Sequence, residues 1–219
     1  MKLIKLGLVI ALSGSVAFAE EKSDLGTSAN VALTSNYVWR GMTQSDNSPA
    51  IQGGFDLDYK GVYVGVWGSN IRFEGSDASL EFDTYAGYTD EIAGVTYDFG
   101  YLQYAYPNDS KASNFGEAYV GLSYDLKVVE VSAKYSVGIE TDELDPDDCV
   151  EGGISAPLLM DITLDATVGN YIHTGIFYNV GISKSFGKFD FSVAYTGMNY
   201  DDSANDDKGN VVATISSSF

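Results

Sequence analysis

Acidic side chains recur in this sequence at alternating positions, a spacing that would gather their charge on one surface. Asp56 and Asp58 are separated by one residue, and so are Glu81 and Asp83. Residues spaced by two lie on the same face of a β-strand. Carboxylates that line an enclosed passage attract cations and repel anions. The charged residues that we expect on such an inner face are Arg40, Asp56, Glu81, Asp83, Asp98, Glu117, Glu130, Lys134, Glu151 and Asp165.

Two basic residues, Arg40 and Lys134, share this predicted inner face with the acids. An arginine can hold a carboxylate through two parallel hydrogen bonds. Arg40 could form such a pair with Glu81 or Asp83 at a constriction, or it could lie at the outer rim. The acids could also hydrogen-bond across a closed interior, with the two basic residues as internal counter-ions. An open passage and a filled interior therefore remain two alternatives at this point.

Catalytic chemistry has little support in the sequence. His173 is the only histidine, and neither a GxSxG motif nor a paired-histidine metal motif occurs. Hydrolases of the outer membrane need a histidine base with partners that position it. We therefore predict no enzyme activity, no catalytic residue and no cofactor, and we interpret His173 as a polar residue at an interface.

Two segments concentrate carboxylates outside this alternating pattern, residues 141–148 (TDELDPDD) and residues 201–207 (DDSANDD). Carboxylate oxygens are ligands that Ca²⁺ prefers, but the glycine and the final glutamate of an EF-hand are not in register. The segments could be solvated loops, weak Ca²⁺ sites, surfaces for adhesion, or contacts with lipopolysaccharide phosphates through divalent ions. The candidate Ca²⁺ ligands are Asp142, Glu143, Asp145, Asp147, Asp201 and Asp202.

The N-terminal residues indicate export from the cytoplasm. Lys2 and Lys5 precede an apolar run over residues 6–12, and an Ala-Phe-Ala cleavage site ends at Ala19. This is the pattern of a secretory signal peptide, and the apolar run is too short to cross a bilayer about 30 Å thick. We therefore predict a signal peptide over residues 1–19, followed by a single domain over residues 20–219.

The mature chain would be strongly acidic. Removing the two lysines of the signal peptide lowers the formal net charge from −19 by two, to −21. Binding to nucleic acid needs basic side chains that such a chain lacks, so nucleic acid is excluded as a partner. Cys149 is the only cysteine, which rules out an internal disulfide. The sequence does not determine the oligomeric state.

The fold follows from the period of two. Most alternating runs are close to the roughly ten residues that a tilted strand needs to cross a bilayer. Tight turns and longer polar loops connect these runs alternately. This pattern predicts an all-β protein, a transmembrane antiparallel up-and-down β-barrel of about twelve strands. Ten or fourteen strands are possible if residues 149–170 divide differently, and a β-sandwich would show the same alternation. The predicted strands are 29–40, 49–59, 61–70, 78–88, 94–105, 115–125, 127–138, 148–157, 162–171, 174–185, 189–199 and 209–219.

Apolar and aromatic residues occupy the predicted outward face, with Tyr and Trp gathered toward the strand ends as in an interfacial girdle. The first predicted strand places Ala29, Val31, Leu33, Ser35, Tyr37 and Trp39 on that face. Both chain ends of such a barrel lie in the periplasm, so the tight turns should face the periplasm and the long acidic loops the outside. The chain stops on Phe219, an aromatic ending that is typical of outer-membrane barrels and resembles the signal read by the barrel-assembly machinery.

Several sequence blocks also resemble the TorF-type family of bacterial porins, over essentially the whole mature chain. The matching blocks are residues 35–37, 39–44, 49–54, 65–70, 81–83, 85–88, 104–107 and 216–219. The resemblance implies an outer-membrane β-barrel with a porin role and carries no catalytic residues.

The function that we predict is passive passage of ions or small polar solutes through the outer membrane, with a preference for cations set by the acidic interior. The alternative is a closed barrel with a structural, adhesion or divalent-cation role exerted through its acidic outer loops. The expected partners are outer-membrane lipid, lipopolysaccharide, the assembly machinery and small cations or polar solutes. The expected location is the bacterial outer membrane.

Overall fold

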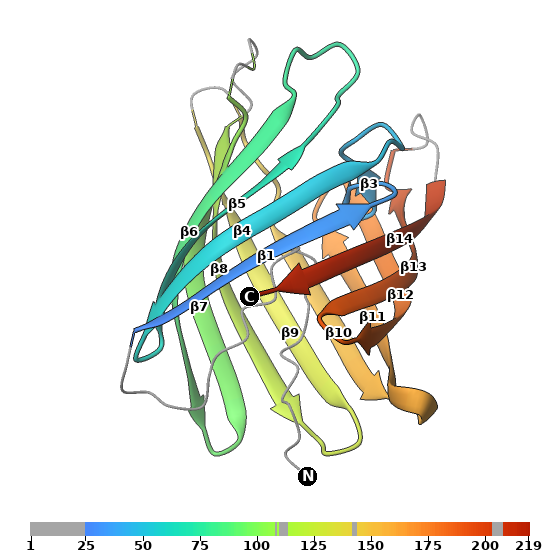
Figure 1. The fold of residues 1–219 in the computed structure, drawn as a ribbon. Coiled ribbons are helices and arrows are strands. Elements are labelled where there is room, and N and C mark those ends of the chain that lie inside the picture. The colour runs from blue at the N-terminus through green and yellow to red at the C-terminus, as the bar shows by residue number, and fades with distance from the viewer. Residues whose placement is uncertain (1–24, 108, 110–113, 142–143, 203–207) are drawn as a thin grey trace.

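A computed structural model describes residues 25–107, 109, 114–141, 144–202 and 208–219. Within this part of the chain, twelve antiparallel strands close into a barrel (Figure 1), as the sequence predicts. The predicted signal peptide lies outside the described residues. The barrel strands are β1 (Gly26–Thr34), β4 (Ala50–Tyr59), β5 (Val62–Asn70), β6 (Leu80–Ile92), β7 (Val95–Ala105), β8 (Phe115–Asp125), β9 (Glu130–Ile139), β10 (Cys149–Pro157), β11 (Ile162–Tyr171), β12 (Gly175–Phe186), β13 (Phe189–Tyr200) and β14 (Lys208–Ser218).

Each strand pairs with its neighbours in sequence, and the barrel closes where β1 pairs with both β14 and β4. Val31, for example, lies opposite Ser217 on one side and Gly53 on the other. The last residue, Phe219, exchanges backbone hydrogen bonds with Ala29. No helix in the described ranges is long and apolar enough to cross a membrane.

The connections alternate as the sequence predicts. Short turns join β4 to β5 and β6 to β7, where Lys60 and Gly61 have φ values of 51° and 88° and Ala93 and Gly94 have 54° and 83°. Two successive residues with positive φ form the turn that matches the twist of a β-hairpin. Longer connections leave the other end of the barrel, except between β11 and β12, where residues 172–174 form the short connection that the sequence predicts there. We call the two ends the tight-turn end and the long-loop end.

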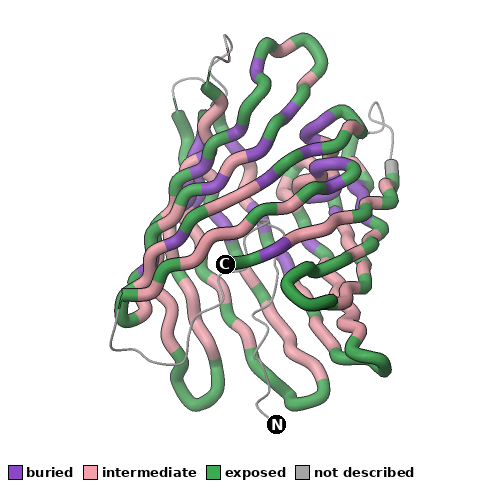
Figure 2. The backbone as a smooth tube through the Cα atoms, in the orientation of Figure 1, coloured by how far each residue is buried: buried purple, intermediate pink, exposed green. Residues whose placement is uncertain are grey.

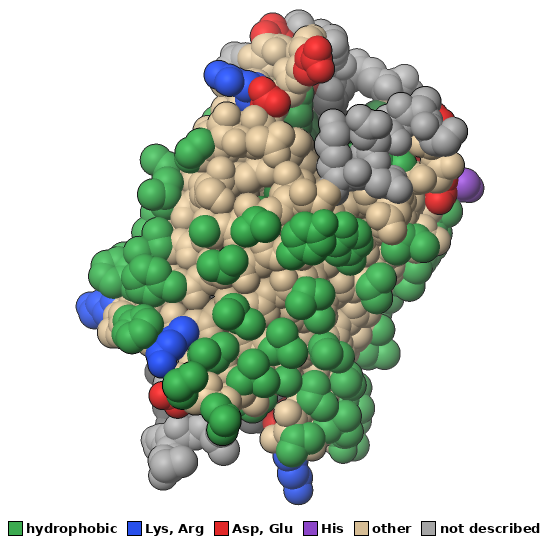
Figure 3. All heavy atoms as spheres, turned by 90° about the vertical axis from the view of Figure 1, so that its right-hand side faces the viewer, with side chains coloured by type: hydrophobic (Ala, Val, Ile, Leu, Met, Phe, Trp, Pro, Cys, Tyr) green, Lys and Arg blue, Asp and Glu red, His purple; other side chains and the backbone are tan. Residues whose placement is uncertain are grey.

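The outer surface is apolar along the strands. Figure 3 shows hydrophobic side chains spread over the middle of one face, with charged side chains toward its upper and lower ends. Phe55, Val120, Ile182 and Tyr195 are all exposed on this surface. Exposed apolar area of this extent marks a surface that contacts lipid or another protein. The outward parity predicted for the barrel strands is thus present in the structure.

The first predicted strand, 29–40, is wrong beyond Thr34. β1 ends there, and the chain turns into the barrel as a short hairpin of β2 (Val38–Trp39) and β3 (Met42–Thr43). We call residues 36–48 the inner hairpin. Its tip is formed by Arg40 and Gly41, with φ values of 46° and 78°. Residues 41–48, which the sequence predicts to be an outer loop between the strands 29–40 and 49–59, are therefore part of a hairpin folded inward.

Two aromatic side chains predicted on the lipid face, Tyr37 and Trp39, lie in the interior instead. Trp67 is also buried inside, so neither tryptophan belongs to an interfacial girdle. Aromatic side chains have large apolar areas, and the barrel interior at the long-loop end provides other aromatic rings for them to contact. Two smaller corrections concern strand bounds: β6 extends to Ile92, and β9 begins at Glu130.

Burial is unequal along the barrel axis. Figure 2 shows buried residues gathered toward the long-loop end, while intermediate and exposed residues dominate the tight-turn end. Three buried clusters lie in the interior. Their central residues are Tyr37 and Trp67 in the first, Leu102, Tyr104 and Phe115 in the second, and Cys149, Phe177 and Met198 in the third.

Candidate functional site: the inner hairpin and the charged lumen

The inner hairpin reaches opposite walls of the lumen. Trp39 makes edge-to-face contacts with Tyr104 on β7 and with Tyr171 on β11, at ring-centroid distances of 5.8 and 5.5 Å. Met42 packs against the cluster formed by β10, β12 and β13. A Cβ atom on Gly41 would fall 2.1 Å from the carbonyl oxygen of Gly197 on β13, so the hairpin tip lies directly against that strand. The hairpin therefore crosses the interior and narrows it.

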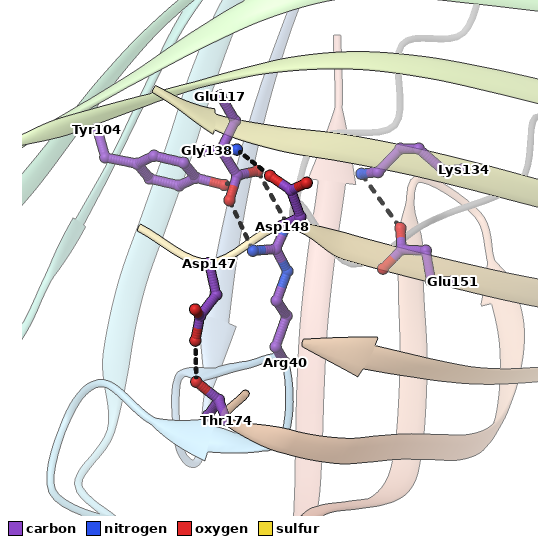
Figure 4. Close-up of polar contacts among 9 residues, drawn as sticks. All are labelled: Arg40, Tyr104, Glu117, Lys134, Gly138, Asp147, Asp148, Glu151 and Thr174. Atoms are coloured by element: carbon purple, nitrogen blue, oxygen red, sulfur yellow. Dashed lines mark hydrogen bonds and ion pairs between the residues drawn. The ribbon is translucent and has the colours of Figure 1, made fainter. Parts of the chain in front are cut away.

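Arg40 fixes the hairpin tip to the wall. Its guanidinium donates two hydrogen bonds to the Glu117 carboxylate on β8, at 2.6 and 2.8 Å (Figure 4). The two side chains are only 6% and 3% exposed. Of the two alternatives that the sequence leaves open for Arg40, the structure has the bidentate pair, but its partner is Glu117 rather than Glu81 or Asp83. Arg40 lies inside the barrel and not at its rim.

Aromatic rings enclose the same guanidinium. The Arg40 Cζ lies 4.4 Å from the Trp39 ring centroid and 4.9 Å from that of Tyr171, which are cation–π distances. Burial on its own would lower the pKa of Arg40, but the charge of Glu117 outweighs it and raises the pKa above its ordinary value. The hairpin therefore carries a permanent positive charge into the lumen.

The opposite side of the hairpin bonds to β6. The Tyr37 hydroxyl donates to Glu81 Oε1 at 2.7 Å, and its ring packs edge-on against Trp67 at 5.4 Å. Burial raises the pKa of Tyr37 well above its ordinary value, and the Glu81 charge raises it further, so the phenol stays protonated and donates. Asp83, which follows Glu81 by two residues on β6, is fully buried. Neither of its carboxylate oxygens accepts a hydrogen bond of good geometry.

A second ion pair lies farther along the lumen wall. Lys134 on β9 contacts Glu151 on β10 at 3.1 Å (Figure 4), and these side chains are 12% and 7% exposed. The two residues are direct partners in the strand register. The Lys134 ammonium also lies 5.6 Å from the ring centroid of Tyr119. The structure thus places both predicted lumen cations, Arg40 and Lys134, beside carboxylates.

Tyrosines satisfy the acids nearer the tight-turn end. The Tyr63 hydroxyl donates to Asp98 at 2.7 Å and contacts the Tyr119 hydroxyl, and Tyr85 donates to Asp56. Ser28 is a further, longer donor to Asp56 at 3.5 Å. The two remaining predicted lumen acids, Glu130 and Asp165, are of intermediate burial and lie two strands apart, each in register with Ser155 between them.

The acidic outer segments are only partly described. Asp142 and Glu143 lie outside the described residues. Asp147 accepts a hydrogen bond from Thr174 at 2.7 Å and lies 3.4 Å from the exposed His173 ring. Within the described ranges, no group of three or more His, Cys, Asp or Glu side chains is arranged to hold a metal ion. The Ca²⁺ candidates stay a prediction without a described site.

Sequence reasoning missed the residues that anchor the hairpin from within the lumen: Tyr37, Trp39, Met42, Tyr104 and Tyr171. One signal could have revealed them. Met42 is an apolar side chain in the connection predicted over residues 41–48, directly after Val38 and Trp39 at the end of the predicted strand 29–40. Apolar side chains in a long connection indicate that it packs against something.

The fold and this lumen define a class of protein: a closed twelve-stranded barrel of the kind formed by outer-membrane porins. The chain is similar to the KdgM porin, with a TM-score of 0.61 and 11% identity over 88% of this chain and 98% of that one. It is similar to the NanC porin with a TM-score of 0.55 and 12% identity over 89% and 99% of the two chains. Outer membrane phospholipase A from Escherichia coli has a TM-score of 0.55 and 12% identity, over 87% and 89%.

The chain belongs to the family described as Gcw_chp, bacterial protein of unknown function, whose model matches residues 18–219. No curated protein matches it. The likeness to solved structures, at these identities, establishes the fold.

Proposed function

We propose that this chain is an outer-membrane channel for the passive passage of small cations and small polar solutes. The observation that carries the proposal is a closed barrel whose interior presents fixed carboxylates and is crossed by the inner hairpin, which Arg40 ties to Glu117. Interior carboxylates attract cations, and a segment folded into the lumen sets the size of what passes. The predicted signal peptide over residues 1–19 supports export from the cytoplasm.

Two porins with this fold support the proposal by their architecture and by contrast. One solved structure of the KdgM porin is described as a complex with disordered oligogalacturonate, an acidic sugar chain. The lumen of the present chain carries many carboxylates and two predicted basic residues, both of which face acids. Repulsion between like charges disfavours such a polyanion here, and so the expected solutes are cationic or neutral.

Current measurements in planar lipid bilayers test the proposal. Pure refolded protein should produce discrete current steps, and a KCl gradient should give a reversal potential of the sign for cation preference. Reversal near zero would contradict the cation preference while leaving a channel. Protein that inserts but gives no current would contradict the channel itself.

A second candidate, a closed barrel with a structural or adhesion role, is favoured by one observation. The interior at the long-loop end is packed, with Tyr104, Met198 and Cys149 no more than 1% exposed. Absence of current from protein that is folded and inserted would support this reading. A rise in melting temperature on adding Ca²⁺ would favour a divalent-cation role of the outer loops.

A further inference from the structure

We propose that Glu81 and Asp83, on β6 beneath the inner hairpin, hold one small monovalent cation of the Na⁺ or K⁺ class. This inference rests on the proposed channel function and names the residues that would set its ion preference. The bound ion would be a permeating cation held at the narrowed part of the lumen, where the hairpin contacts β6 through Tyr37.

The first step of the argument is the balance of charge in the interior. Arg40 is paired with Glu117, and Lys134 is paired with Glu151. Among the ion pairs of the described residues, none involves Glu81 or Asp83. These two carboxyl groups lie on the same face of one strand, two residues apart, without a basic side chain as partner.

The second step is their burial. Glu81 is 1% exposed and Asp83 is 0% exposed. Glu81 accepts the hydrogen bond from Tyr37, whereas neither oxygen of Asp83 accepts a hydrogen bond of good geometry. An ionised carboxylate taken out of water is strongly destabilising unless a partner compensates its charge. A bound cation at Asp83 supplies that compensation.

The third step is the class of cation. Ca²⁺ takes six to eight oxygen ligands and Mg²⁺ takes six in strict octahedral geometry. The described residues offer no group of three acidic, histidine or cysteine side chains that could hold a metal ion. Because Tyr37 already stabilises the charge of Glu81, a single positive charge is sufficient to neutralise Asp83. A monovalent ion with few protein ligands fits this arrangement best.

The neighbouring tryptophan provides a direct readout of binding. Trp67 lies opposite Asp83 in the strand register and is buried, with its indole Nε1 also lacking a partner. The chain has only two tryptophans, so Trp39→Phe leaves Trp67 as the sole tryptophan. Refolded Trp39→Phe protein in detergent micelles should then be titrated with NaCl or KCl against N-methylglucamine chloride at constant ionic strength.

We expect a saturable change in Trp67 emission with Na⁺ or K⁺ and none with N-methylglucamine. Adding Asp83→Asn to this background should abolish the change. The matched control is Glu91→Gln, which removes an exposed carboxylate from the same strand and face. Circular dichroism checks that each variant is folded, and Glu81→Gln serves as the second variant if Asp83→Asn does not fold. Equal titrations in all three salts, or an unchanged response in Asp83→Asn, would overturn the proposal. So would a response that follows pH alone.

Reversal potentials in a KCl gradient provide the second measurement. Asp83→Asn should lower the K⁺ to Cl⁻ permeability ratio several-fold, whereas Glu91→Gln should leave it unchanged. If the wild-type channel conducts and Asp83→Asn keeps its full ion preference, this inference fails while the proposed function stands. If the wild-type protein does not conduct, the proposed function fails, and the fluorescence titration still decides whether the cation site exists.

Discussion

The two halves of the barrel interior solve the same problem of buried charge in different ways. Toward the long-loop end, the inner hairpin brings Arg40 to a carboxylate that is almost fully buried, and aromatic rings enclose the pair. Toward the tight-turn end, Asp98 accepts a hydrogen bond from Tyr63 and is only partly buried, while Asp56 accepts one from Tyr85 and is buried without a basic partner among the described residues. Near the long-loop end, the charge of the buried carboxylate is compensated by the inner hairpin, which is not part of the barrel wall. Near the tight-turn end, the hydrogen bonds come from the wall strands alone.

This difference indicates that the width of the lumen and its charge are set by different parts of the chain. The hairpin sets the width of the lumen, because it touches β7, β11 and β13 at once. The wall supplies most of the carboxylates. Changes to the hairpin should therefore alter conductance and stability together, whereas changes to partly buried wall acids, such as Asp98 and Glu130, should alter charge with little loss of stability.

The largest effect should come from removing the inner hairpin. Replacing residues 36–48 with a short Gly-Ser connection takes the obstructing segment out of the lumen. Because a twelve-stranded barrel leaves room inside once it is not filled, single-channel conductance should rise roughly threefold or more. Bilayer recordings measure this. Replacing residues 126–129, the short connection between β8 and β9 at the tight-turn end, with a Gly-Ser connection is the control and should leave conductance near the wild-type value. A hairpin deletion with wild-type conductance would show that the hairpin does not narrow the path.

The next effect concerns the two ion pairs. Arg40→Ala leaves Glu117 buried without its partner, so the free energy of unfolding should fall by about 3 to 5 kcal/mol. Lys134→Ala breaks a less buried pair with one close contact, and it should cost about 1.5 to 3 kcal/mol. Urea unfolding of both variants in the same detergent measures the two losses. Equal losses would contradict the ranking of the two ion pairs by burial.

A pair of glycines tests the close fit of the hairpin tip. Gly41 has a φ of 78° and faces the Gly197 backbone, so Gly41→Ala should displace the hairpin, raise conductance and lower the free energy of unfolding by about 1 to 3 kcal/mol. Gly187 at a tight turn has a φ of 63° with nothing within 4 Å of the added Cβ. Gly187→Ala should therefore cost only about 1 kcal/mol and leave conductance unchanged. A conductance change in Gly187→Ala would refute the assignment of narrowing to the hairpin.

The smallest effect is expected in the tight-turn half. Glu130 is of intermediate burial, so Glu130→Gln should change the free energy of unfolding by no more than about 0.5 kcal/mol. Urea unfolding checks the value. A loss comparable to that of Arg40→Ala would mean that this half of the interior is as tightly coupled as the other.

Much of the barrel follows from the sequence because its strands repeat a period of two. The barrel wall is apolar on its outer face and polar on its inner face, so every second residue of a strand must be apolar. Val120 and Val180 are examples on the outer face. The alternation of long and short connections adds the topology. These are local signals, repeated in every strand, and they predict the number of strands and nearly all of their bounds.

The inner hairpin could not be predicted from the same signals. The alternation of β1 continues through Tyr37 and Trp39, so the chain reads as one long strand although it turns at Thr34. What turns it inward is a set of contacts with strands far away in the sequence, such as Arg40 with Glu117. Alternation along the strands predicts which acids face the lumen. It does not predict which of them pairs with Arg40, because that depends on where the hairpin tip lies.

The inner hairpin is made early in synthesis, yet it docks on residues that the ribosome delivers much later, among them Tyr171 and Met198. Contacts between residues so far apart in sequence carry a larger loop-closure cost than local pairing, so they are expected to form late in folding. The inner hairpin should then dock only after the strands that hold its partners are in place.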